Sequence, residues 1–294
     1  MLAAFQYQGL IEQALQEDLG TGDLSAAIFS ESAWTKAKIY AKQKGTLCGL
    51  EVTKQVFKTV DAQLDVKVLA KDGEKVERGT VVIEVSGPVR SILSAERTAL
   101  NFLQHLSGVA SATYQAVKEC EGLPTRITDT RKTLPGLRML QKYAVRMGGG
   151  QNHRFGLYDA VMLKDNHIAA AGGIRPAVEA ARRQIGHMVK IEVECETLAQ
   201  VEEAVASGAE VIMLDNMDLE KMHKAVEMVN GRAVLEASGG IKKGSIRAVA
   251  ETGVDVISIG AITHSVKALD FSLDIGDIKA QTKERWEDGE NCAK

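Results

Sequence analysis

The chain has little of what several protein classes depend on. Aromatic residues make up only 4% of its 294 residues, so a surface that stacks nucleic-acid bases is not expected. The four cysteines, Cys48, Cys120, Cys195 and Cys292, never fall at CxxC spacing, which argues against a zinc site or a disulfide framework. No apolar run approaches the roughly 18 residues that a membrane-spanning helix needs.

An excess of positive charge is also missing. Lys and Arg number 36 against 39 Asp and Glu, so no overall basic field attracts a phosphate backbone. Residues 1–20 carry no basic stretch ahead of their apolar residues, unlike a secretory signal. The remaining composition, 45% hydrophobic and 26% charged, is that of an ordinary globular protein. We therefore expect a cytoplasmic protein that binds neither nucleic acid nor a membrane.

The first hundred or so residues mix helix and strand patterns. Residues 8–20 place apolar side chains on one helical face, and Gly20 stops that helix. Alternating segments at 37–50, 64–70 and 80–88 predict strands. A long helix rich in small residues follows over 91–120, with a break expected near Gly108.

From about residue 125 the chain alternates between strand-like and helical segments. Six segments have strand character: 125–130, 160–167, 190–196, 210–216, 233–240 and 255–263. Helical patterns separate the last five, and this order predicts a parallel sheet, either an open doubly wound sheet or a barrel. Polar residues end every segment. That favours the barrel, because each barrel strand contributes to a site at its carboxyl end.

Cationic side chains gather at these strand ends and in the loops that follow them. They are Arg131, Lys132, His153, Arg154, Lys164 and His167. Single Lys and Arg residues are usually solvated surface. A set that converges on a barrel mouth instead predicts a ligand with several negative charges. The glycine run 148–150 precedes His153, where a loop that closes over a ligand and a plain connector both fit.

Two further patterns complete the candidate site. Glu194 and Asp215 end neighbouring strands, where they could organise Mg²⁺ or simply pair with nearby lysines. Small residues at 237–240 and 258–263 follow the last two strands, where backbone N–H groups can approach a phosphate; ordinary turns are the alternative. A phosphorylated sugar, a metal and a polyanion together indicate phosphoribosyl transfer with loss of magnesium pyrophosphate, a reaction helped mainly by orientation and charge compensation.

These motifs resemble a known family. DTRKTLPGLR, GGGQNHRFGLYDAVMLKDNHI, EVECET, MLDNM, LEASGGI and ISIGAITHS, in this order, are similar to quinolinate phosphoribosyltransferases, also called nicotinate-nucleotide pyrophosphorylases (carboxylating). The segments LQEDLGTGDLS and SAERTALNFLQHLSG resemble the same family, so the likeness runs nearly end to end.

The resemblance implies an α/β fold with two domains. An N-terminal α/β sandwich, residues 1–106, would precede an irregular (β/α) barrel of about six strands, residues 107–267, and the tail from about 268 to 294 would return to the first domain. It also implies a homodimer, possibly a hexamer, with active sites at the subunit interface. The implied reaction converts quinolinate and phosphoribosyl pyrophosphate to nicotinate mononucleotide, pyrophosphate and CO₂, with Mg²⁺, in de novo NAD synthesis.

The resemblance also implies roles for particular residues. Arg131, His153, Arg154 and Lys164 would hold the quinolinate carboxylates, and Arg97 would reach them from the neighbouring subunit. Lys132 would contact phosphoribosyl pyrophosphate, and Glu194 and Asp215 would organise the metal and ribose. The 5′-phosphate would lie at the glycine-rich loops, on Ser238, Gly239, Gly240 and Gly260, with His264 nearby.

Two alternatives remain open from the sequence. A related phosphoribosyltransferase could act on nicotinate or another heteroaromatic acid, although a monocarboxylate would not need Arg97, Arg131, Arg154 and Lys164 together. A non-catalytic barrel that senses a phosphorylated metabolite would keep the phosphate loops but need neither the acids nor the arginines.

Overall fold

The computed structural model describes residues 3–276 and divides the chain into two compact units. The first is Met1–Ser111 together with the chain from Lys267 onward, and the second is Ala112–Val266. The division falls within one helix, a little beyond the boundary predicted after residue 106. Residues 277–294, the larger part of the tail predicted to return to the first domain, lie outside the described residues.

The first unit contains a four-stranded antiparallel sheet in the order β12-β1-β5-β3. Its strands are β1 (Trp34–Ala41), β3 (Asp65–Val68), β5 (Val81–Pro88) and β12 (Phe271–Ile275), and a separate two-stranded sheet joins β2 (Gly45–Thr46) to β4 (Lys75–Val76). Its helical elements are η1 (Ala4–Gln6), α1 (Gln8–Leu19), η2 (Ala26–Ile28), α2 (Leu50–Val60) and the first part of α3 (Val89–Glu119).

Helix α2 and strand β12 of this unit were not predicted. Helix α2 buries Leu50, Val52, Val56 and Phe57, a helical spacing that lies directly after the strand pattern at 37–50. Strand β12 belongs to the tail, yet it pairs with the whole second half of β1 and buries Phe271 on the sheet. Both are short apolar stretches whose partners lie elsewhere in the chain.

Helix α3 is continuous over 31 residues, so the predicted break at Gly108 was wrong. The glycine is there for a different reason. A Cβ atom at Gly108 would lie 2.5 Å from the carbonyl oxygen of Lys267 and 3.1 Å from the Cα of Ala268. The returning chain therefore crosses α3 where the helix has no side chain.

The second unit contains a six-stranded parallel sheet in the order β6-β11-β10-β9-β8-β7. The strands are β6 (Arg126–Thr128), β7 (Val161–Leu163), β8 (Ile191–Cys195), β9 (Val211–Asp215), β10 (Val234–Ser238) and β11 (Val256–Ser258). Its helices are the end of α3 with α4 (Arg138–Met147), α5 (Asp165–Ala171), α6 (Ile174–Gln184), α7 (Leu198–Ala206), α8 (Leu219–Val229), α9 (Ile246–Glu251) and α10 (Ala261–His264).

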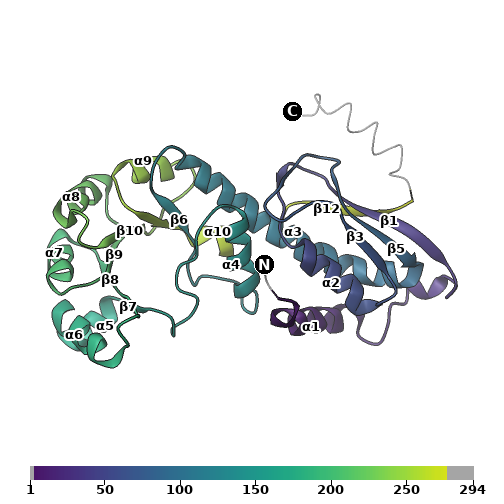
Figure 1. Ribbon diagram of the computed structural model, residues 1–294, viewed down its shortest axis with the longest axis horizontal. Helices are drawn as coiled ribbons and strands as arrows, with labels where there is room; N and C mark the ends of the chain where they lie inside the picture. The colour runs from purple at the N-terminus through teal and green to yellow at the C-terminus, as the bar shows by residue number, and fades with distance from the viewer. Residues whose placement is uncertain (1–2, 277–294) are drawn as a thin grey trace. The chain divides into compact units, whose positions relative to one another are not determined.

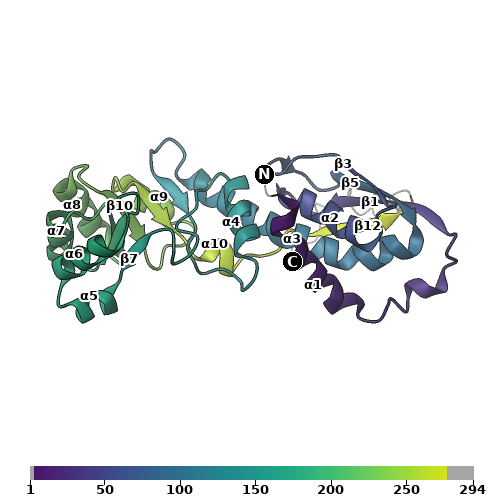
Figure 2. The ribbon, with the colours of Figure 1, turned by 60° about the horizontal axis from the view of Figure 1, so that its bottom comes forward.

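The six predicted strand segments all contain a strand, and the predicted fold class is confirmed. Helices α6, α7 and α8 cover the outer side of β8, β9 and β10 (Figures 1 and 2). Strands β6 and β7 are the two ends of the sheet, and Gln151 adds only an isolated parallel bridge to Thr128. This incomplete closure makes the barrel irregular. No helix within residues 3–276 is long and apolar enough to span a bilayer.

Helix α4 follows the loop that carries Arg131 and Lys132 and, like the short helices α5 and α10, was not predicted. It buries six consecutive residues, from Leu140 to Val145, including Gln141 and Lys142. Because polar residues are among those it buries, the sequence of α4 does not show the apolar periodicity by which a helix is recognised. Gly148 caps its carboxyl end, and a Cβ at Gly150 would lie 2.7 Å from the Thr113 side chain, so Gly150 is tightly packed, whereas Gly149 is exposed.

Candidate active site

A cavity of about 580 Å³ lies at the carboxyl ends of the parallel strands. Ten of the residues predicted for the site line it: Arg131, Lys132, His153, Arg154, Lys164, Glu194, Asp215, Ser238, Gly239 and Gly240. They come from five different strands or the loops between them. Chain positions more than a hundred residues apart are thereby brought to one opening.

Strand alternation explains why these side chains face inward. Successive residues of a strand point to opposite faces, so every second residue shares a face. On β9, Met213 and Asp215 line the cavity, while the buried Ile212 and Leu214 face the covering helices. The parallel register places Ser238 of β10 beside Asp215, which builds one continuous polar rim.

Three other predicted residues are not part of that lining. Gly260 and His264 belong to the loop and short helix after β11, where a Cβ on Gly260 would lie 3.0 Å from Lys132 Cδ and 3.2 Å from His264 Nε2. Gly260 therefore permits the close approach of Lys132 and His264. Arg97 lies on α3 in the first unit and borders a separate hollow there with Asp18.

The two arginines at the mouth have few acceptors for their donors among the described residues. Arg131 Nε is buried and has no hydrogen-bond partner among the described residues. Arg154 donates from Nη1 to the carbonyl oxygen of Ala160 at 3.0 Å. Burial, and then the charge of Arg131, lower the pKa of Arg154. Both effects are relieved by an anion in the cavity.

The two acids have different partners, and only Glu194 pairs with a lysine. Glu194 forms an ion pair with Lys164, and Asp215 accepts a hydrogen bond from Asn216 Nδ2 at 2.8 Å. These contacts use Glu194 Oε2 and Asp215 Oδ2, so each carboxylate has a second oxygen that could bind a metal ion. Two carboxylates from neighbouring strands, beside a site that can admit phosphate and water, are a donor set that suits Mg²⁺.

The loop after β10 is shaped for close approach of a ligand to the backbone. Gly239 and Gly240 both have positive φ angles, of 90° and 63°. A Cβ on Gly239 would collide with the side chain of Asn216, itself in the left-handed region at φ 52°. Only glycine therefore fits at 239, and the bare backbone that results can present N–H groups to a phosphate.

A buried acid cluster under the cations was not predicted. His153 Nε2 lies 3.1 Å from Glu192 Oε2 and 3.6 Å from Glu236 Oε1, and both carboxylates are almost fully buried. Glu192 is two residues before Glu194, and Glu236 is two before Ser238. The same period of two that placed the rim residues could therefore have identified both acids as inward-facing.

The cluster changes the titration of its members. Burial, and then the charge of Glu192, raise the pKa of Glu236 to about 7, although His153 and Ser258 act in the opposite direction. Burial lowers the pKa of His153, but the hydrogen bond to Glu192 and the charges of Glu236 and Glu192 outweigh it, so that pKa is raised. The two acids therefore stabilise a proton on His153 Nε2, the ring nitrogen that faces them.

These three residues also lie at distances a metal ion could bridge. The histidine ring argues against that use. His153 Nδ1 accepts a hydrogen bond from the Arg154 N–H at 2.7 Å, so the neutral ring carries its proton on Nε2 and offers no lone pair to a metal there. The cluster is therefore an acid–histidine network.

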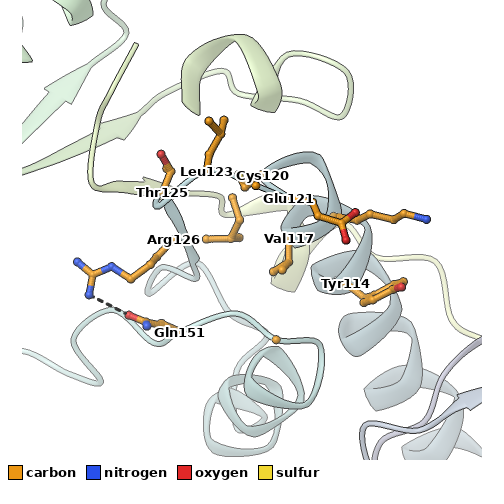
Figure 3. A pocket seen from close by; sticks show the side chains of 12 residues that line it. Tyr114, Val117, Cys120, Glu121, Leu123, Thr125, Arg126 and Gln151 are labelled. Atoms are coloured by element: carbon orange, nitrogen blue, oxygen red, sulfur yellow. Dashed lines mark hydrogen bonds between the residues drawn. The ribbon is translucent and has the colours of Figure 1, made fainter. Parts of the chain in front are cut away.

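A second hollow, of about 480 Å³, lies beside the amino end of strand β6 (Figure 3). Its lining includes Tyr114 and Val117 of α3 and Arg126 at the start of β6, where Arg126 donates to Gln151. It contains none of the predicted site residues. The amino ends of barrel strands are generally concerned with stability rather than catalysis.

The fold and the first cavity define a class of protein: an α/β-barrel enzyme whose mouth is built for anionic, phosphorylated substrates. Comparison with known proteins makes this more specific. Residues 23–107 match the model of the quinolinate phosphoribosyl transferase N-terminal domain, and residues 109–274 match that of its C-terminal domain.

Similar whole proteins agree. A Bacillus subtilis (strain 168) protein named "probable nicotinate-nucleotide pyrophosphorylase [carboxylating]" is 48% identical over 92% of this chain and 93% of its own. The crystal structure of NadC from Streptococcus pyogenes has a TM-score of 0.90 at 45% identity, covering 94% of this chain and 99% of that one. The nicotinate-nucleotide pyrophosphorylase of Francisella tularensis has a TM-score of 0.91 at 42% identity, covering 94% and 98%. This chain belongs to the quinolinate phosphoribosyltransferase family.

Proposed function

We propose that the protein transfers the phosphoribosyl group of phosphoribosyl pyrophosphate to quinolinate and decarboxylates the product, giving nicotinate mononucleotide, pyrophosphate and CO₂ for NAD synthesis. The observation that carries this is the convergence of Arg131, His153, Arg154 and Lys164 on one cavity that also contains the Gly239 loop. A dicarboxylate needs several cations, and a phosphoribosyl group needs a phosphate loop.

Within this proposal the side chains mainly orient and neutralise the substrates. Arg131, Arg154, Lys164 and His153 hold the two carboxylates, so that the ring nitrogen faces the anomeric carbon. The nitrogen lone pair forms the new bond as pyrophosphate leaves, and the ring becomes a pyridinium. When the adjacent carboxylate departs as CO₂, the electron pair left on the ring carbon is stabilised by the positive nitrogen, and that carbon then takes up a proton. No acid–base residue is required in the first step.

Lys132, Ser238, Gly239, Gly240, Gly260 and His264 are the proposed contacts to the phosphoribosyl part. The proximity of Lys132 to Gly260 and His264 supports a common phosphate region for the loops after β6 and β11. Glu194 and Asp215 are the proposed holders of Mg²⁺, which would supply positive charge to compensate that of pyrophosphate.

We also propose that the active form is a homodimer, or a hexamer built from dimers, in which Arg97 completes the site of a second copy. Apolar side chains support this, since large exposed ones often mark interfaces. Leu24 and Ile28, in the hollow that Arg97 borders, are 90% and 80% exposed. Leu157 and Tyr158, in the loop just after Arg154, are 71% and 80% exposed.

The test is product release from the purified protein. Quinolinate, phosphoribosyl pyrophosphate and Mg²⁺ are supplied, with nicotinate as the parallel substrate and omission of Mg²⁺ as the control. We expect CO₂ and pyrophosphate in equal amounts from quinolinate only. Pyrophosphate from nicotinate alone would assign a different heteroaromatic acid, and binding without any release would indicate the metabolite-sensing alternative.

A further inference from the structure

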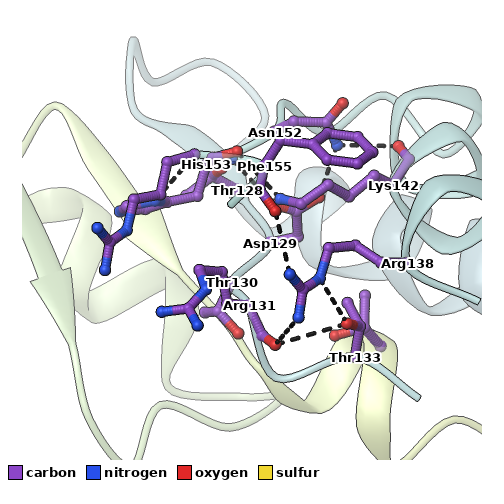
Figure 4. A network of polar contacts seen from close by, with 12 residues as sticks. Thr128, Asp129, Thr130, Arg131, Thr133, Arg138, Lys142, Asn152, His153 and Phe155 are labelled. Atoms are coloured by element: carbon purple, nitrogen blue, oxygen red, sulfur yellow. Dashed lines mark hydrogen bonds and ion pairs between the residues drawn. The ribbon is translucent and has the colours of Figure 1, made fainter. Parts of the chain in front are cut away.

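A buried ion pair lies directly behind the segment that carries His153 and Arg154 (Figure 4). Lys142 of α4 and Asp129, the residue after β6, are 1% and 0% exposed, and Lys142 Nζ pairs with Asp129 Oδ1. The lining of the cavity contains neither side chain. The pair therefore does not touch a ligand and has to act, if at all, through other residues.

Its contacts are made to the backbone of His153. The His153 N–H donates to Asp129 Oδ1 at 2.9 Å, and Lys142 Nζ donates to the His153 carbonyl oxygen at 3.0 Å. Asn152 closes the network, because its Nδ2 donates to Asp129 Oδ2 at 2.6 Å and to the Lys142 carbonyl oxygen at 2.9 Å. Both peptide groups of His153 are thus fixed, and with them the directions of the His153 and Arg154 side chains.

One turn earlier on α4, a second side chain makes similar contacts. Arg138 donates from Nη2 to the Arg131 carbonyl oxygen at 3.3 Å, from Nε to Thr133 Oγ1 at 3.0 Å and from Nη1 to the Phe155 carbonyl oxygen at 3.2 Å (Figure 4). Residues four apart lie on one face of a helix. One face of α4 therefore forms hydrogen bonds to both loops that supply the cations, the loop with Arg131 and the loop with His153 and Arg154.

Stability does not explain why a charged pair occupies this position. Removing two charges from water costs more than their mutual attraction commonly returns, and well-packed hydrophobic side chains are often as stable or more so. What a hydrophobic pair could not do is bond to both the N–H and the C=O of His153. The geometry of the pair, with one donor and one acceptor at fixed spacing, matches that peptide segment.

We propose that Lys142 and Asp129 are positioning residues for quinolinate: they fix the backbone of His153 so that His153 and Arg154 face the substrate carboxylates. This inference rests on the proposed function. It assigns the pair an effect on the dicarboxylate, because all of the proposed phosphoribosyl contacts except Lys132 lie after β10 and β11, on other elements.

The decisive variant is the double change Asp129→Asn with Lys142→Met. The single change Lys142→Met would leave a buried carboxylate unpaired, so it would test folding as much as positioning. In the double variant both side chains are neutral and close to the original volume, and the amide oxygen introduced at position 129 can still accept from the His153 N–H. The double variant loses the ion pair, the donor to the His153 carbonyl and the bond that Asn152 Nδ2 donates to Oδ2 of residue 129, because the new amide has a single acceptor oxygen.

The measurements are calorimetric Kd values of the full-length protein for quinolinate and, separately, for phosphoribosyl pyrophosphate with Mg²⁺, together with Tm. We expect a quinolinate Kd raised at least about tenfold, the effect of losing one good hydrogen bond to a charged group, with the second Kd within about threefold and Tm near that of the wild type. Arg146→Met, an exposed cation on the same helix, is the matched control and should change none of the three.

The alternatives give different results. A double variant with wild-type Tm and wild-type quinolinate Kd overturns the positioning role, and equal weakening of both ligands assigns the pair a merely structural one. If the double variant melts early, Asn152→Ala decides, because it leaves both charges in place: a quinolinate Kd raised about threefold or more supports the inference and an unchanged one overturns it. Wild-type protein that binds no quinolinate would instead overturn the proposed function.

Discussion

Replacing Glu236 by Gln should remove much of the pH dependence of folding. The carboxyl is 5% exposed, and burial together with the charge of Glu192 raises its pKa to about 7. Glutamine keeps the shape of the protonated acid but cannot ionise. The variant therefore isolates the free energy that ionisation of this one group costs the folded state.

The sign and size follow from the pKa in the two states. In the unfolded chain the group titrates near its ordinary value of 4.5. Below that pH it is protonated in both states. Between 4.5 and about 7 the folded state holds the extra proton, so stability falls as the pH rises, and above about 7 the loss is complete. At about 1.4 kcal/mol for each pH unit, the interval corresponds to roughly 3 kcal/mol.

His153 adds to the same trend. Its pKa is raised, so the stability that it contributes is present below 6.5 and is lost as the pH rises through its folded pKa. Part of that increase comes from the charge of Glu236 and disappears in the variant. Both effects make the free energy of unfolding fall more steeply with rising pH in the wild type than in Glu236→Gln.

The assay is urea unfolding at steps of pH, monitored by a signal from the second unit. From about pH 5 to about pH 8 we expect the free energy of unfolding of the wild type to fall by roughly 2–3 kcal/mol more than that of Glu236→Gln. Glu202→Gln, an exposed carboxyl on α7, is the control and should follow the wild type. Parallel curves for the wild type and Glu236→Gln would refute the reasoning.

Four further outcomes are expected. Arg154→Ala should lower kcat/KM for quinolinate about ten- to hundredfold, as expected for a lost charged contact, and a wild-type value would exclude the proposed carboxylate contact. Gly239→Ala should raise the KM for phosphoribosyl pyrophosphate about tenfold, because alanine is strained at φ 90°. Steady-state kinetics measures this KM, and an unchanged value would contradict the role of the loop. Glu194→Gln should lose turnover more than substrate binding, most of all at low Mg²⁺, and a magnesium titration that matches the wild type would contradict the metal role. Arg97→Ala and Lys164→Ala should each be nearly inactive but recover about a quarter of wild-type activity when mixed, since half of the dimers then contain one intact site; no recovery would place Arg97 in the site of its own chain.

The sequence predicted the second unit well because its signals are local. Each strand of β8 to β11 is a short apolar run followed by a helical pattern, and polar residues mark its carboxyl end. Strand order and handedness then leave few ways to assemble the sheet. Polar residues at the carboxyl ends of these strands then located site residues such as Asp215 and Ser238.

The first unit was less predictable because its elements depend on distant partners. Phe271 lies in the tail and becomes part of a strand only by pairing with β1, more than two hundred residues earlier in the chain. The glycine at 108 looked like a helix break because nothing in the sequence places Lys267 against it. Both errors come from long-range packing that overrides local preference.

The buried pair behind the site, Lys142 and Asp129, was not predicted for a related reason. Lys142 is one of 36 Lys and Arg residues, and the ordinary expectation for any of them is solvent. What distinguishes it is a buried Asp129 thirteen positions earlier, with the backbone of His153 between them. A sequence shows the cations that face the ligand, because strand ends locate them. It does not show the buried charges that support those cations from the other side. Such a charge differs from a surface charge only in being buried beside a partner, and that partner is known only from the folded structure.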